Sequence, residues 1–160
     1  YYENIEGEKK DLKPLITAKK KFNFIIDNYP NTDFALDAKF KIDLINDILA
    51  SKEMYLGRHY VKKEKWIAAI NRFQNVLKDY DTTIYAEEAI HRLVEIHYKI
   101  GLESEAKKYA SLLGYNYLSS QWYKKTYKIF NKKYTADKIQ KENKENKEKR
   151  DLKEIFKKLF

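Results

Sequence analysis

The sequence predicts an all-α protein, an α-solenoid in which antiparallel helix pairs stack one after another. Three observations lead to this prediction. Gly and Pro are scarce, with four and two copies in 160 residues, so few of the turns that separate strands are present. Apolar residues recur with a period of about 3.6 residues. Similar stretches also return along the chain, which is the mark of a repeat architecture.

The repeats are visible in three stretches that begin beside a tyrosine. These are "NYPNTDFALDA" (28–38), "DYDTTIYAEEA" (79–89) and "NYLSSQWYKKT" (116–126). A second repeated pattern precedes each stretch, in which an Ala is followed by two apolar residues at helical spacing. Its three copies are Ala18, Phe22 and Ile25; Ala69, Phe73 and Val76; and Ala106, Ala110 and Leu113. Each unit is therefore expected to be one pair of helices.

The same patterns set the expected helix bounds. We expect helices near 11–28, 33–62, 65–80, 84–100, 103–114 and 120–131, followed by a charged helix near 136–159. Thr32, Thr83 and Ser120 stand where N-caps belong, because their hydroxyls accept the free backbone N–H groups of a helix start. Gly101 and Gly114 stand where helices are expected to end.

The helix at 33–62 is expected to be unusually long. No Gly or Pro interrupts the chain between Asn31 and Leu56. This repeat exceeds the next by fourteen residues, which lengthens its first helix by roughly 21 Å. We expect its end to project from the stack and to offer surface to a partner.

Farther along, small residues such as Gly57 and Ala69 allow close approach of two helices, with Phe73 filling the gap beside them.

The spacing around residues 56–73 resembles the tetratricopeptide repeat. Residues at the familiar offsets of that repeat are Leu56, Gly57, Tyr60, Trp66, Ala69 and Phe73, with Asp81 where a Pro is usual. The next unit fits less well, because His97 and Ala110 replace the usual aromatic residues. We expect 1–131 to form an array of about two and a half units, with 132–160 as a basic, charged extension that ends in an amphipathic segment.

Longer runs resemble one family more closely. "YPNTDFALDAKFKI", "LASKEMYLGRHYVKKEKWIAAINRF", "EEAIHRLVEIHYKIGLESEA" and "NYLSSQWYKKTYKIF" are similar to the C-terminal half of the BamD family. The resemblance covers about residues 1–130. It includes the elongated helix, the stretch that contains Asn71 and Arg72, and the pair Trp122 and Tyr123. It departs at Leu118, which replaces a Pro, and in the tail 131–160.

The resemblance implies a non-enzymatic scaffold of the outer-membrane β-barrel assembly (BAM) complex. It implies a lipoprotein on the periplasmic face of the outer membrane, anchored by a lipidated Cys upstream of this chain. The implied partners are the POTRA domains of BamA, other BAM subunits and unfolded β-barrel clients. Arg72 is the best candidate for a charged contact to BamA, with Asn71 beside it. The ordinary alternatives for Arg72 are an exposed charge or a pairing with an acidic residue such as Asp79 or Glu103.

No pattern points to catalysis, a cofactor or a metal. The chain has three His and no Cys, and it lacks a phosphate-binding loop, a nucleophile elbow and an HExxH motif. Glu87, His91 and Glu95 share one helix face, which we interpret as a solvated face with salt bridges. We expect His59 and His97 to pack at the seams between helices.

The net charge of +9 is concentrated at the end of the chain, since residues 128–160 carry twelve Lys or Arg and six Asp or Glu. Nucleic-acid binding is not expected, because Glu residues alternate with the lysines and no aromatic residues are interleaved.

The last residues follow helical amphipathic spacing: Leu152, Ile155, Phe156, Leu159 and Phe160. This end can fold back on the solenoid, enter a partner groove or rest on anionic headgroups, and protein docking is favoured. The main functional alternative is another tetratricopeptide scaffold that binds peptides.

Overall fold

A computed structural model describes residues 12–131, and within this range the chain is entirely α-helical. Its helices are α1 (Lys13–Asn28), α2 (Asp33–Lys62), α3 (Trp66–Asp79), α4 (Ala86–Lys99), α5 (Glu103–Asn116) and α6 (Gln121–Phe130). The all-α prediction is confirmed, and the observed bounds lie within two residues of those expected. The charged helix expected near 136–159 lies outside the described residues.

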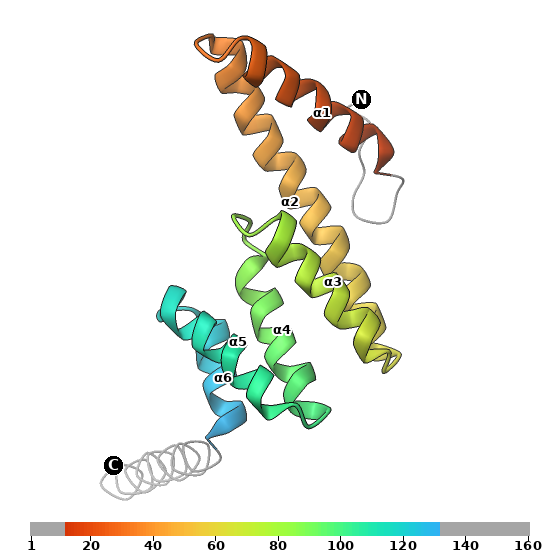
Figure 1. Cartoon of the computed structure of the whole chain (residues 1–160), viewed down its shortest axis with the longest axis vertical. Coiled ribbons are helices and arrows are strands. Elements are labelled where there is room, and N and C mark those ends of the chain that lie inside the picture. Colours follow the sequence, from red (N-terminus) through yellow and green to blue (C-terminus); the bar gives the residue numbers. More distant parts are fainter. Residues whose placement is uncertain (1–11, 132–160) are drawn as a thin grey trace, which may run out of the picture.

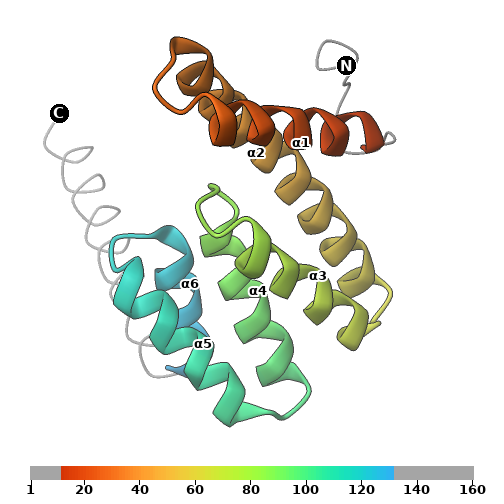
Figure 2. The same ribbon diagram turned by 45° about the horizontal axis from the view of Figure 1, so that its top comes forward.

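Successive helices pack against one another, as in a tetratricopeptide array. Each of the first five pairs with its neighbour in the chain, and α4 also packs on α6. Both views show α1 lying along the first half of α2, whereas α3 lies along the second half (Figures 1 and 2). The 30 residues of α2 make a helix of about 45 Å, which confirms the elongated helix. Among residues 12–131, no helix is both long and apolar enough to span a bilayer.

The main core is a cluster of buried side chains between α2, α3 and α4. Phe73 is fully buried at its centre. Its buried neighbours in the same cluster are Ala50, Met54, Ala69, Val76, Ala89, Leu93 and Ile96. Gly57 on α2 faces the Phe73 ring so closely that a Cβ there would lie 2.5 Å from a ring carbon. The expected role of Gly57 in close helix approach is therefore confirmed.

Two of the expected N-caps are confirmed and one is wrong. The Thr32 hydroxyl accepts from the Ala35 N–H at 3.2 Å, and the Ser120 hydroxyl accepts from the Trp122 N–H at 3.1 Å. Thr83 does not cap α4, because that helix begins three residues later and the Thr83 hydroxyl donates to the Tyr80 carbonyl at 2.7 Å.

Gly101 ends α4 as expected, but Gly114 has a different role. Gly101 comes just after the end of α4, and its φ of +84° is in the left-handed region. Gly114 lies inside α5, and a Cβ there would lie 3.0 Å from the Tyr123 ring. The prediction that Gly114 ends a helix is wrong, because its missing side chain is used for packing against α6.

The turn after α2 has the same backbone pattern as the turn after α4, with a glutamate in the left-handed position. Glu64 has φ +55°, and Lys65 N–H donates to the Tyr60 carbonyl at 3.0 Å, as Leu102 N–H donates to the His97 carbonyl at 2.8 Å. We expect Glu64→Gly to stabilise the fold by about 1 kcal/mol, because a left-handed conformation strains residues with a Cβ.

The reciprocal change, Gly101→Ala, is expected to destabilise the fold by about 1 kcal/mol, although a Cβ at Gly101 meets no atom within 4 Å. Urea unfolding followed by circular dichroism measures both changes. If both variants shift stability in the same direction, backbone strain is not the cause.

Candidate functional site

Arg72 lies on α3 at the edge that faces α2, and its acidic neighbour comes from α2. The Arg72 Nη1 is 3.3 Å from Glu53 Oε1 and 3.4 Å from Glu53 Oε2. Asn75 Nδ2 donates to Glu53 Oε2 at 3.0 Å. The structure thus shows the ordinary alternative of a pairing with an acidic residue, although that residue is Glu53 and neither Asp79 nor Glu103. The Arg72 side chain remains 36% exposed while that of Glu53 is 18% exposed, so the guanidinium is both held in place and accessible.

Asn71 points outward on the same helix, beside an exposed apolar residue. Ile67, Asn71, Gln74 and Lys78 are all exposed and follow helical spacing, so they form one surface, which we call the α3 outer face. Ile67 is 75% exposed, so it adds an apolar side chain to this surface. Sequence reasoning missed Ile67, although its position four residues before Asn71 was the available signal.

A second candidate region is a cleft between α2 and α4. It encloses about 170 Å³ and is lined by Arg58, Val61, Lys62 and Arg92. Arg58 donates to both carboxylate oxygens of Glu88, at 3.0 and 2.7 Å. Arg92 also reaches Glu88, at 3.3 Å. The cleft therefore combines a cationic rim with one apolar side chain, and sequence reasoning did not identify it.

The face of α4 that carries Glu87, His91 and Glu95 is covered by α6. His91 is 3% exposed, and its Nδ1 lies 2.7 Å from Thr126 Oγ1. Its ring packs against Trp122 with centroids 5.1 Å apart. The predicted salt bridges are present, since Glu95 lies 2.7 Å from Arg92 Nη1 and 3.4 Å from His91 Nε2, but the prediction of a solvated face is wrong because α6 packs on this side of α4. Within residues 12–131, no group of three or more His, Asp or Glu side chains is placed to hold a metal.

The other two histidines differ from each other. His97 is buried at a seam as expected, where Nδ1 donates to the Leu93 carbonyl at 2.7 Å and the ring packs on Tyr109. His59 is exposed instead, so its expected place at a seam is wrong. Neither His59 nor His97 lines the cleft between α2 and α4.

Two glutamates in this region have lowered pKa values. Burial alone would raise the pKa of Glu95, but the hydrogen bond and charge of His91 together with Arg92 outweigh burial and lower the pKa to about 2. Burial likewise opposes ionisation of Glu88, and Arg58 and Arg92 outweigh it and lower the pKa of Glu88. Both carboxylates are therefore more favourable as anions in the folded protein than in the unfolded chain.

Acid should weaken the pairing of Glu95 with His91 and Arg92 within α4 and so lower the stability of the fold. The ordinary pKa of Glu95 is 4.5 and the folded value is about 2, so its contribution is complete above pH 4.5 and is lost as pH falls toward 2. We expect the melting temperature of the wild type to drop across this window, and the drop to be smaller in Glu95→Gln. Exposed Glu103→Gln is the control. Equal pH dependence in the wild type and Glu95→Gln would contradict the assignment.

Comparison with known proteins gives a consistent result. Residues 1–112 match the family model YfiO, described as an outer membrane lipoprotein. Over 129 residues the chain is 47% identical to the outer membrane protein assembly factor BamD of Rickettsia prowazekii, covering 81% of this chain and 51% of that protein. Over 131 residues it is 41% identical to the BamD of Caulobacter vibrioides, covering 82% and 43%. The chain thus spans about half the length of the curated relatives it matches.

Proposed function

This chain belongs to the outer membrane lipoprotein family YfiO, and from that we propose that it acts as a scaffold in the assembly of outer-membrane β-barrel proteins. In this proposal it performs no catalysis and binds the periplasmic POTRA domains of BamA through α3. The family match and the BamD relatives support the assembly role. Because the fold is a stack of rigid helix pairs, it is suited to holding a partner at fixed geometry.

The observation that carries the proposal is the position of Arg72. Glu53 contacts Arg72 through Nη1, which leaves Nε and Nη2 able to donate to a carboxylate on the partner. Asn71 precedes Arg72 in the chain and lies about 100° around α3 from it, so it supplies a polar contact on the adjoining α3 outer face. An arginine that is already oriented loses less conformational entropy on binding than a freely rotating one.

The energetic effect of Arg72 depends on how completely the partner covers it. Its side chain is about one-third exposed before binding, and a covering partner would remove that surface from water. Charge pairs that become desolvated in an interface contribute several kcal/mol to the measured loss when one member is removed, whereas pairs at the rim contribute little. We propose that Arg72 lies inside the contact area, so that its removal costs more than the loss of a pair at the rim would.

The remaining features of the proposal follow from family membership. The family description names an outer membrane lipoprotein. We propose that this chain faces the periplasm, that a lipid anchor upstream of it holds it at the membrane, and that other BAM subunits bind beside BamA. Unfolded β-barrel clients are the proposed cargo, and neither a cofactor nor nucleic acid takes part.

The cleft between α2 and α4 favours a second, compatible role in binding client segments. Arg58 and Arg92 already pair with Glu88, and Arg92 also with Glu95, so Lys62 beside Val61 is the lining cation that suits a short peptide with an acidic or terminal carboxylate and an apolar side chain. Since this cleft and the α3 outer face involve different residues, the chain can bind BamA and a peptide independently. The same cleft would serve the alternative of a general tetratricopeptide scaffold that binds peptides.

Calorimetric titration of the full chain with purified BamA POTRA domains tests the proposal. We expect a one-to-one complex whose affinity falls with salt, because charged groups contribute to it. Lys62→Ala in the cleft is expected to leave this affinity unchanged but to weaken binding of a peptide from the C-terminal strand of a β-barrel client. No measurable POTRA binding, with peptide binding retained, would favour the general peptide-binding scaffold.

A further inference from the structure

The first half of α2 (33–47) exposes an apolar face that its second half buries. Leu36, Phe40 and Leu44 are 56%, 61% and 50% exposed and follow one another at intervals of four residues. Leu36 precedes Met54 by eighteen residues, which is five helical turns, so both lie on the same side of α2. Met54 is fully buried in the core with α3 and α4 residues. The face therefore continues past the end of α3 without a covering helix among the described residues.

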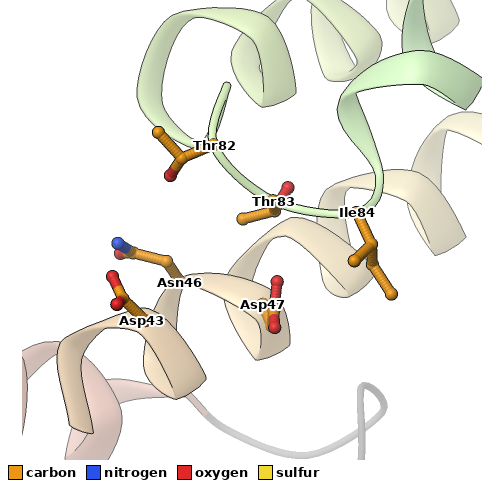
Figure 3. A pocket seen from close by; sticks show the side chains of 6 residues that line it. All are labelled: Asp43, Asn46, Asp47, Thr82, Thr83 and Ile84. Atoms are coloured by element: carbon orange, nitrogen blue, oxygen red, sulfur yellow. The ribbon is translucent and has the colours of Figure 1, made fainter. Parts of the chain in front are cut away.

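A polar cavity adjoins this face where the α3–α4 turn meets α2. It holds about 220 Å³ and is lined by Asp43, Asn46 and Asp47 of α2 and by Thr82, Thr83 and Ile84 of the turn. Figure 3 shows the three α2 side chains on the side of the helix that faces the turn. Ile84 is 78% exposed at the rim, which extends the apolar surface.

The charge of the cavity is uncompensated. Asp43 and Asp47 are one helical turn apart, and neither makes an ion pair with any residue between 12 and 131. Like charges at this spacing destabilise a helix by about 0.2–0.5 kcal/mol. Asn46 Oδ1 is also buried without a hydrogen-bond partner in the described part of the chain. Two free carboxylates and an unpaired acceptor favour a cationic N–H donor as the occupant.

The sequence of this chain itself provides a segment of matching chemistry. Residues 152–160, which we call the terminal segment and which lie outside the described residues, read "LKEIFKKLF". They contain three lysines, one glutamate and five large apolar residues at amphipathic helical spacing. The intervening residues 132–151 can extend up to about 66 Å, at about 3.3 Å per residue, whereas all of α2 is about 45 Å long. Docking on the first half of α2 therefore requires residues 132–151 to be extended and not part of the charged helix expected near 136–159.

We propose that the terminal segment docks on the first half of α2 of the same chain, with its apolar residues over Leu36, Phe40 and Leu44. One of its lysine side chains enters the cavity beside Asp43 and Asp47. Attachment to the same chain favours this occupant over a separate protein, because a tether keeps the segment at high effective concentration. Docking covers an apolar surface that a soluble protein would otherwise expose. The inference is independent of the proposed binding of BamA.

Distance measurement between two spin labels tests the proposal on the full chain. The sequence has no Cys, so labels attached to Lys39→Cys on α2 and Glu154→Cys in the terminal segment are unambiguous. We expect a short, narrow distance population at low salt that is lost at about 1 M salt, where the screening length is about 3 Å. Absence of a short population at low salt would overturn the proposal.

Charge variants of the doubly labelled chain identify the docking surface. Asp43→Asn with Asp47→Asn should reduce the docking equilibrium severalfold, since each exposed ion pair contributes up to about fivefold. Glu64→Gln with Glu103→Gln makes the same charge change at exposed sites elsewhere and should leave the population unchanged. Equal effects of the two pairs would overturn the assignment to the cavity. If mixed singly labelled chains give the short distance instead, the occupant is a second copy and the same-chain proposal fails.

Discussion

Phe73→Ala should destabilise the protein by about 3–5 kcal/mol, the largest stability change expected from a single substitution here. Phe73 is fully buried where α2, α3 and α4 meet, so its removal leaves a cavity that three helices cannot all close. A loss of this size is a large fraction of the total stability of a typical domain. Urea unfolding followed by circular dichroism measures it. Ile67→Ala on the same helix is the control, because Ile67 is 75% exposed and should change stability by less than about 0.5 kcal/mol.

The contact between Phe73 and Gly57 can be tested by a double-mutant cycle. A Cβ at Gly57 would lie 2.5 and 2.7 Å from two Phe73 ring carbons, so Gly57→Ala forces the ring to move and should destabilise by about 1–3 kcal/mol. In a Phe73→Leu background the ring is absent, so the added methyl should cost much less. Additive effects of the two substitutions would show that Gly57 does not act through Phe73.

Arg72→Glu should weaken binding of BamA by at least about 2 kcal/mol, or about thirtyfold in Kd. In the proposed complex, the substitution removes the donors that would face a carboxylate of BamA and places a negative charge there instead. It also sets two carboxylates side by side at Glu53, which reinforces the repulsion. Titration calorimetry with POTRA domains measures the change, and circular dichroism is expected to show unchanged helicity.

Two further variants separate a specific contact from a general charge effect. Lys20→Glu makes the same charge change on the exposed surface of α1 and should leave BamA affinity within a factor of about two. Arg72→Lys keeps the charge but loses the planar fork, so its affinity should fall between the wild type and Arg72→Glu. A loss as large for Lys20→Glu as for Arg72→Glu would mean that overall charge, and not Arg72, controls binding.

The helices were predictable because their signals are local. Apolar periodicity and cap residues such as Thr32 and Ser120 act within one or two turns, so the sequence alone locates the helix ends closely. The wrong predictions arose where the same residue type can serve either at a helix end or in another structural role. Gly114 resembles a helix-ending glycine, yet it serves to admit the Tyr123 ring from α6. The hydroxyl of Thr83 resembles a cap, yet it bonds within the turn before α4.

The candidate site was predictable only in part, because its partners come from other helices. The family resemblance pointed to Arg72 and Asn71, but the position of Glu53 opposite Arg72 depends on how α2 crosses α3. The burial of His91 likewise depends on α6, whose Thr126 is 35 residues away. Contacts of this kind follow from the packing of antiparallel helices and leave no mark in the local sequence pattern.

The central proposal is that BamA binds at Arg72 and the adjoining α3 outer face, and site-specific photocrosslinking tests it most directly. A photoreactive amino acid placed at Asn71 should give a covalent adduct with BamA in cells, because Asn71 is exposed beside Arg72. The same amino acid at Asn23, an exposed asparagine on α1, should give no such adduct. An adduct from Asn23 but none from Asn71 would contradict the account.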